Sequence, residues 1–270
     1  MKKYKLNVAI LFLAALMMCT LLPAQDHKEE ISVDLTNPSQ SGTLDVRSHN
    51  GTITIEGYSG NEVLVEIYTP ENDDDDDEHQ GNKHGLKKIS MKSMNVDIYE
   101  EENYVKIEGG QKRTDFVIKV PRKFDLAIKA HHNGTVEVSN VEGQMEIISH
   151  HGAIRLEDVA GSLVADTHHG EITANFLSIT DKPMAFSTYH GDVDIAFPPG
   201  TNFDAKIKSE RGDIYTDFEV SMNPVNKESR KNKSGKKQIK IGGWMTGKFG
   251  SGGKEYLFNT YHGDVIIRKS

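Results

Sequence analysis

Cysteine is almost absent from this 270-residue sequence, which contains one, Cys19. Because Cys19 lies inside the N-terminal apolar run, the rest of the chain has no thiol and cannot be stabilised by a disulfide. No later segment approaches the run of about 20 apolar residues that a membrane-spanning helix needs. Helical hydrophobic periodicity is also missing after that run, which argues against an α/β fold.

Catalytic signatures are missing as well. The sequence has no serine nucleophile elbow, no phosphate-binding loop and no zinc-protease helix motif. Some parallel β-helices cleave polysaccharides. This sequence, however, has only one tryptophan, Trp244, with which to line a sugar-binding groove. We therefore expect a protein that is not an enzyme, and keep a carbohydrate-active enzyme as the last alternative.

The N-terminus has the three parts of a secretory signal peptide. Three lysines fall among the first five residues, an apolar run follows from Val8 to Leu22, and Ala24 supplies a small residue before the cleavage site. Residues 1–24 are therefore predicted to be removed, and the protein to be exported to the periplasm, the cell surface or the medium. A retained anchor is one alternative. Lipidation at Cys19 is another, but Met18 stands where a small residue is expected.

Charge is unevenly distributed along the chain. Loss of the three N-terminal lysines changes the formal net charge from −8 to −11, which argues against nucleic acid as a partner. Acidic residues concentrate in 71–88 and basic residues in 223–240, and both segments are predicted to be loops because like charges repel and bury little. The aspartates at 73–77 could bind calcium, but they lack the glycine-spaced order of a calcium loop, so a solvated run is favoured.

A nine-residue glycine repeat dominates the second half of the chain. Each glycine precedes a segment in which apolar or small residues alternate with others, the pattern of a strand with one buried face. The glycines are Gly134, Gly143, Gly152, Gly161 and Gly170. Asn or His precedes every second one, so the structural period is twice the glycine spacing, with two short strands per coil. The period lengthens at Gly191 and Gly212, Gly263 is expected to close the series, and Gly51 to open it.

A longer phrase, Ser/Thr-x-x-Gly-x-Ile/Val, marks the start of each coil. Its Ser/Thr residues are Ser48, Ser149, Thr167, Thr188, Ser209 and Thr260, and a seventh copy at Gly134 has His131 in that position. One coil cannot bury its own apolar residues, whereas coils stacked about 4.8 Å apart can. The repeat predicts an all-β protein, a parallel β-solenoid of about 18–21 residues per coil. Its predicted core contains Val136, Val138, Ile154, Leu156, Ile172, Val193 and Ile195.

The remaining segments alternate like strands but are less regular. A solenoid needs a cap, because its terminal coil would otherwise expose a sheet edge. Residues 25–130, with the acidic loop 71–88, are therefore predicted to form a β-rich N-terminal cap. Residues 131–270, with the basic loop 223–240, are predicted to form the solenoid.

These phrases resemble the bacterial putative-adhesin β-solenoid family, whose domain has no known function. The resemblance covers roughly residues 31–270 and rests on Ser149-His-His-Gly-Ala-Ile154, Thr188-Tyr-His-Gly-Asp-Val193 and Thr260-Tyr-His-Gly-Asp-Val265, with the linking phrases Val141-Glu-Gly143 and Val159-Ala-Gly161. It implies the fold and an exported location, and it supplies no catalytic residues. This chain differs in placing His or Asn before the glycine, so the resemblance says nothing about the role of its histidines.

Histidines gather just before the repeat glycines, and eight of the 12 occupy the two preceding positions. Stacked coils would arrange these positions in two columns. One column is predicted to be Asn133, His151, His169, His190 and Arg211, and the other His132, His150, His168, Tyr189 and Glu210. Imidazoles about 4.8 Å apart can stack, or can share zinc or another transition metal. The candidate metal ligands are His150, His151, His168, His169 and His190, with exposed turn residues as the competing interpretation.

Aspartates recur directly after three repeat glycines, at Asp192, Asp213 and Asp264. They are predicted to form hydrogen bonds at the turns, with a cation or sugar site as the alternative. The predicted function is an exported, non-enzymatic, adhesin-like binding or envelope structural module that needs no cofactor and binds a surface protein or a glycan. A metal-binding module that uses the His-rich edge is the alternative.

Overall fold

The computed structural model describes residues 27–69, 95–132, 134–223, 228–231, 237–240 and 243–270. Every regular element in these residues is a β-strand, which confirms the predicted all-β class. Within the same ranges, no helix has the length and apolar character needed to cross a membrane. The predicted signal peptide and the acidic segment 71–88 lie outside the described residues.

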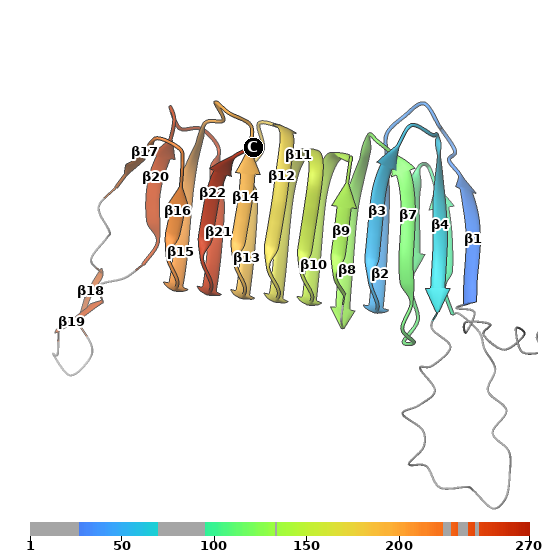
Figure 1. Ribbon diagram of the computed structural model, residues 1–270, viewed down its shortest axis with the longest axis horizontal. Coiled ribbons are helices and arrows are strands. Elements are labelled where there is room, and N and C mark those ends of the chain that lie inside the picture. Colours follow the sequence, from blue (N-terminus) through green and yellow to red (C-terminus); the bar gives the residue numbers. More distant parts are fainter. Residues whose placement is uncertain (1–26, 70–94, 133, 224–227, 232–236, 241–242) are drawn as a thin grey trace, which may run out of the picture.

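Most strands form two ladders that enclose a common core, and together they make one 20-stranded mixed sheet (Figure 1). The first face contains, in spatial order, β5 (Asp97–Glu101), β6 (Tyr104–Glu108), β2 (Gly42–Asn50), β8 (Phe124–His132), β10 (Glu142–His151), the second half of β11 (Ile154–His169), β13 (Met184–His190), β21 (Glu255–His262), β15 (Phe203–Arg211), β20 (Met245–Phe249) and β17 (Val220–Met222). The second face contains β1 (His27–Asp34), β4 (Glu62–Thr69), β7 (Asp115–Pro121), β3 (Ile53–Tyr58), β9 (Val136–Ser139), the first half of β11, β12 (Ile172–Ile179), β14 (Val193–Phe197), β22 (Val265–Lys269) and β16 (Ile214–Thr216).

The central strands pair in parallel with the predicted coil length. Gly143 of β10 lies opposite Gly161 of β11, two glycine spacings further along the repeat, which matches the shorter coil. Ala165 of β11 lies opposite Phe186 of β13, which matches the longer coil. These ladders therefore have a solenoid-like register. They belong to a mixed sheet, however, because antiparallel pairs such as β1–β4 and β15–β20 join them near the two ends.

The spatial order of the coils differs from their order in the sequence. The last coil, β21 and β22, lies between the coil of β13 and β14 and the coil of β15 and β16 (Figure 1). The prediction that Gly263 closes the series is therefore wrong. Gly51 does not open it either, because β6 and β7 pair with β2 and β3 on the side away from β8 and β9.

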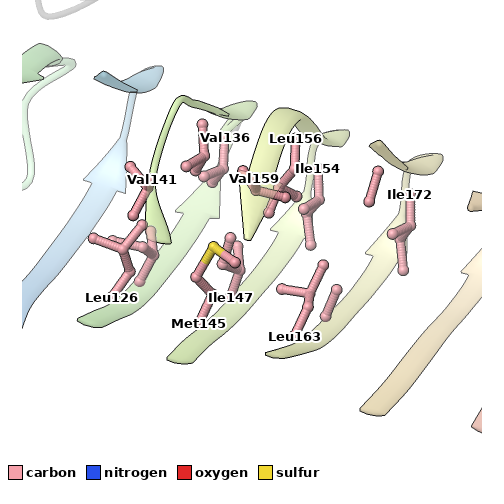
Figure 2. Close-up of a cluster of buried hydrophobic side chains, with 14 of the residues drawn as sticks. Leu126, Val136, Val141, Met145, Ile147, Ile154, Leu156, Val159, Leu163 and Ile172 are labelled. Atoms are coloured by element: carbon pink, nitrogen blue, oxygen red, sulfur yellow. The ribbon is translucent and has the colours of Figure 1, made fainter. Parts of the chain in front are cut away.

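The core lies between the two faces and confirms the predicted inward residues. Ile154 is fully buried, with Val136 opposite it on one side and Ile172 on the other. Figure 2 shows these side chains in stacked rows, with Leu126, Met145 and Leu163 forming another row. Each apolar side chain therefore packs against its counterpart in the next coil. Stacking buries apolar side chains that a single coil could not bury.

The Ser or Thr hydroxyl of the repeat phrase forms a hydrogen bond to the neighbouring coil. The buried hydroxyl of Thr188 donates to the carbonyl oxygen of Gly170 at 2.9 Å, and that of Thr260 donates to Gly191 at the same distance. In the copy at Gly134, the prediction that His131 takes the Ser/Thr position is wrong, because Ala130 lies opposite Ser149. The hydroxyl thus satisfies a carbonyl of the neighbouring coil, which explains why the phrase pairs Ser or Thr with glycine.

The N-terminal segment continues the parallel ladders, since β2 and β8 pair from Gly42 opposite Phe124 to Asn50 opposite His132. No interruption of the ladder marks residue 131 in the part of the chain that the structure describes, and the division into a cap and a solenoid stays a prediction. In the basic segment, β18 (Glu228–Lys231) pairs antiparallel with β19 (Lys237–Lys240) in a separate two-stranded sheet. These described residues are therefore a short strand pair and not a loop.

Candidate functional site

Histidine and tyrosine rings line the corner where the first face ends and the chain turns into the second. The last two positions of each first-face strand lie beside those of the next strand, so they form two columns. We call these columns together the ring edge. Column A contains Asn50, His132, His151, His169, His190, His262 and Arg211. Column B contains His49, His131, His150, His168, Tyr189 and Tyr261.

The predicted columns need two corrections. Ala130 pairs with Ser149, a longer offset than the regular repeat gives, so His132 stands in the column where Asn133 was expected and His131 stands where His132 was expected. Asn133 itself lies outside the described residues. In addition, His190 is followed by His262 and not directly by Arg211, because β21 is inserted between β13 and β15.

Rings within each column are stacked. In column A, the centroids of His169 and His190 are 4.9 Å apart with 7° between the planes, and those of His190 and His262 are 4.6 Å apart. In column B, His150 and His168 are 5.3 Å apart at 8°. This spacing follows from the separation of neighbouring strands, because neighbouring rings in a column belong to neighbouring strands.

Rings of the two columns meet edge to face. His150 and His151 have centroids 4.3 Å apart at 68°, and their Nδ1 atoms are 2.8 Å apart. One of these two nitrogens must carry a hydrogen atom and donate a hydrogen bond to the other. At the far end, Nη1 of Arg211 is 3.2 Å from Nε2 of His262. Since arginine only donates, Nε2 of His262 is the acceptor in this contact.

The environment of the ring edge favours neutral imidazoles. Partial removal from water lowers the pKa of His150, and the neighbouring His151 lowers it further. The pKa of His151 and that of His169 are lowered in the same way, by desolvation first and then by neighbouring histidines. Desolvation also lowers the pKa of His190, and for this residue the second cause is His262. A column of rings this close resists protonation because each new cation would repel the next.

The repeat aspartates hydrogen-bond at the turns, as predicted. Asp192 Oδ1 accepts the backbone N–H of Asp264 at 2.8 Å, and Asp264 Oδ1 accepts that of Asp213 at 2.8 Å. These carboxylates connect one coil to the next, so the hydrogen-bonding interpretation holds for Asp192 and Asp264.

The predicted metal ligands are brought together only in part. His150, His151, His168, His169 and His190 all lie in the ring edge, as neighbours in the two columns. Across the described ranges, no three His, Cys, Asp or Glu side chains converge in a way that could hold a metal ion. The Nδ1 atoms of His150 and His151, 2.8 Å apart, therefore form a pair and not a complete coordination shell.

The predicted second column contains Tyr189 but not Tyr261, so the sequence predicts only part of the tyrosine extension of this ladder of rings. Tyr189 stacks on His168 at 5.0 Å and on Tyr261 at 4.8 Å. The signal was present in the repeated phrase Thr-Tyr-His-Gly-Asp, which carries a ring at both positions before the glycine. Tyr261 is missing from the predicted column because the coil of β21 was expected at the end of the series, whereas it lies between β13 and β15.

The model of one protein family, Toastrack DUF4097, matches residues 16–268. The chain belongs to the Toastrack DUF4097 family. This match confirms the resemblance drawn from the repeat phrases, and the family is one of unknown function. No curated protein matches the chain.

Several solved structures are similar to this Toastrack protein, at low identity. A "putative cell adhesion protein" from Clostridium sporogenes is 9% identical, with a TM-score of 0.45, and the match covers 91% of this chain and 100% of that one. A "putative adhesin" from Bacteroides fragilis is also 9% identical, with a TM-score of 0.34 and coverage of 91% and 98%. One from Parabacteroides merdae is 7% identical, with a TM-score of 0.26 and coverage of 92% and 97%.

Proposed function

We propose that this chain is an exported, non-enzymatic, adhesin-like binding module, and that the ring edge is the surface that contacts its partner. The observation that carries the proposal is the unbroken display of nine imidazole and two phenol rings along the corner. Flat, mostly uncharged rings held by a stacked sheet lose little conformational freedom on binding. They offer stacking faces and hydrogen-bonding atoms to a surface protein or a glycan.

The groups beside the ring edge support a binding role over catalysis. The hydroxyl of Thr167 donates to the carbonyl of Gly152 at 3.0 Å, and that of Thr188 donates to Gly170. The carboxylates of Asp192 and Asp264 accept backbone N–H groups. Hydroxyls and carboxylates engaged in holding coils together are poorly placed to act as nucleophile or general base.

A binding assay with two matched variants tests the role of the ring edge. The protein from residue 25 is applied to a cell-envelope extract separated into protein and glycan fractions. The edge variant carries His131→Asn, His150→Asn, His168→Asn and Tyr189→Asn, one change on each of four neighbouring strands. The control carries Lys129→Asn, Glu146→Asn, Asp166→Asn and Ser187→Asn, which are outward-facing residues of the same strands.

We expect the edge variant to lose at least about tenfold in apparent affinity and the control to bind like the original protein. Equal binding by both variants would remove the ring edge from the proposal. Export is tested separately, by N-terminal sequencing of the protein recovered outside the cytoplasm, which should begin at Gln25. A lipid-modified Cys19 would contradict the predicted cleavage.

A metal-binding module remains the second candidate, favoured by the 2.8 Å between the Nδ1 atoms of His150 and His151. Two imidazole nitrogens at this distance can bind one transition-metal ion, whose other ligands would be water or atoms of a partner. Zinc or copper should then raise the melting temperature at pH 7.5 and much less at pH 5.5, because protons compete for the same nitrogens. Changing His150, His151, His168 and His169 together to Asn should abolish this shift. Absence of any shift in the original protein would refute the metal site.

A further inference from the structure

A hollow of about 750 Å³ opens on the outer side of the second face, on residues other than those of the ring edge. Its polar lining comes from outward-facing residues of β3, β9, β11, β12 and β14, with Arg268 of β22 at one end. These six strands are separated by five steps of about 4.8 Å, so the groove crosses about 24 Å of the stack. The hollow therefore suits an extended ligand that runs along the stack, across the strands.

Register places a row of polar side chains along this groove. Glu137 lies opposite Thr54 on one side and Arg155 on the other. Thr173 follows Arg155, and Asp194 follows Thr173. Hydroxyl, carboxylate and guanidinium groups thus alternate from one coil to the next, at the spacing of the coils.

Charges in the groove balance. Three acidic side chains, Glu137, Glu157 and Asp194, face three basic ones, Arg155, Arg268 and Lys269. Arg155 is 2.5 Å from Glu171 and 3.9 Å from Glu137, and Arg268 is 2.9 Å from Asp194. A polyanion or a polycation would meet as much repulsion as attraction here. The groove is therefore suited to an uncharged ligand that both donates and accepts hydrogen bonds.

Two buried oxygen atoms of the groove lack hydrogen-bond partners within the described residues. They are Oδ1 of Asn175 and Oδ1 of Asp194. Nε of Arg268 lies 2.9 Å from the Asp194 oxygen, but the N–H does not align with it as a hydrogen bond, so that contact is electrostatic only. A buried acceptor without a hydrogen bond is costly, and rotation of either side chain toward the groove would let a ligand hydroxyl donate to it.

A peptide fits this groove less well. The strands that form its floor are paired on both sides, as β12 is with β11 and β14, so no free strand edge is offered to an extended peptide. The apolar residues among the lining, such as Leu156 and Ala174, are buried in the core and form no open pocket for an apolar side chain.

We propose that this groove binds a neutral oligosaccharide that lies along the stack of coils. Sugar hydroxyls would donate to Asn175 and Asp194 and accept from Arg155 and Arg268. This inference names a glycan site separate from the ring edge. It rests on the proposed function in one respect only, namely that this chain is a binding protein.

An oligosaccharide array tests the proposal with the protein from residue 25. The array holds neutral oligosaccharides of increasing length beside sulfated and uronate-containing ones. Thr173→Arg extends a long side chain into the groove from the outer surface of β12. The matched control, Val164→Arg, adds the same charge at a residue that is 44% exposed on the first face. Asn175→Ala is a second variant, which removes one unpartnered acceptor without filling the groove.

We expect the original protein and Val164→Arg to retain neutral oligosaccharides, longer chains better than disaccharides. Thr173→Arg and Asn175→Ala should each weaken retention, the first by at least about tenfold. Circular dichroism and melting curves check that both variants fold. Retention of charged glycans alone, no retention of any glycan, or unchanged binding by both groove variants would overturn the proposal. The edge variant should still bind. If it alone loses binding, the glycan occupies the ring edge, which would support the proposed function and refute the groove site.

Discussion

At the residue scale, the repeat glycines are required mainly because neighbouring coils touch at the corners. A Cβ atom on Gly170 would lie 2.3 Å from the carbonyl oxygen of Gly152 in the coil below. Gly170 does not have a positive φ, so space and not backbone conformation excludes a side chain there. At Gly263 both reasons apply, because φ is +145° and a Cβ atom would lie 2.1 Å from the Gly191 oxygen.

Gly170→Ala is therefore expected to destabilise the protein by about 1–3 kcal/mol, because the methyl group must push two coils apart. Gly243→Ala is the control, since a Cβ atom there has no neighbour within 4 Å among the described residues. Thermal unfolding of both variants measures the difference. Equal melting temperatures would show that the coils can separate without cost.

At the element scale, each strand of the central ladders has one face that belongs to the core and one that belongs to the surface. Along β11, Ile154 and Leu156 are buried, while Arg155 and Glu157 between and after them are exposed. This period-two pattern made the inward residues predictable, because a register shift by one residue would turn every apolar side chain outward. The outward residues carry no such constraint, so the polar row of the groove could not be recognised from one strand at a time.

Ile154→Asp should lower the free energy of unfolding by about 4 kcal/mol or more, because it leaves an unpaired charge in the core between Val136 and Ile172. Val164→Asp introduces the same charge on β11 at an exposed position and should change stability little. Denaturant unfolding distinguishes the two. If Ile154→Asp unfolded at the same denaturant concentration as the original protein, the assigned register of β11 would be wrong.

At the scale of the whole molecule, the order of the coils ties distant parts of the chain together. The C-terminal coil of β21 and β22 occupies the middle of the C-terminal half of the stack (Figure 1). Ser209 donates to the Gly263 carbonyl and Thr260 to the Gly191 carbonyl, so hydroxyl bonds hold both sides of the inserted coil. Contacts of such long sequence separation close large loops, which costs entropy before the contacts form.

Removal of residues 255–270 should therefore disrupt more than one coil. It would separate β13 from β15 and expose the apolar faces of both coils, whereas loss of a terminal coil exposes only one. We expect the shortened protein to lose protection of β15 and β16 from a protease, together with cooperative unfolding. Retained protection of these strands would indicate that β13 and β15 can pair directly.

The ring edge should make stability depend on pH. The folded-state pKa values of His150, His151, His169 and His190 are lowered, so the unfolded chain binds protons more readily. The contribution is fully present above the unfolded pKa near 6.5 and is lost as the pH falls from that value toward the lower folded-state pKa values. The melting temperature should therefore drop between about pH 7.5 and 5.5. Replacing His150, His151, His168 and His169 with Asn should flatten this dependence, and an equally steep dependence in the variant would assign it to other groups.

The sequence by itself determined the class of the fold, the coil length and the inward-facing residues, because these depend on local alternation and on a short repeated phrase. It also determined that histidines would gather in columns. The tertiary structure alone decided which coils are neighbours, and with them the membership of each column. The physical reason is that every coil presents similar apolar rows, glycine corners and Ser/Thr hydroxyls, so the phrase of one coil fits many others. Long-range pairing therefore placed His262 beside His190 and Ala130 beside Ser149, and it assembled the polar groove from six strands whose outward-facing residues the repeat phrase does not specify.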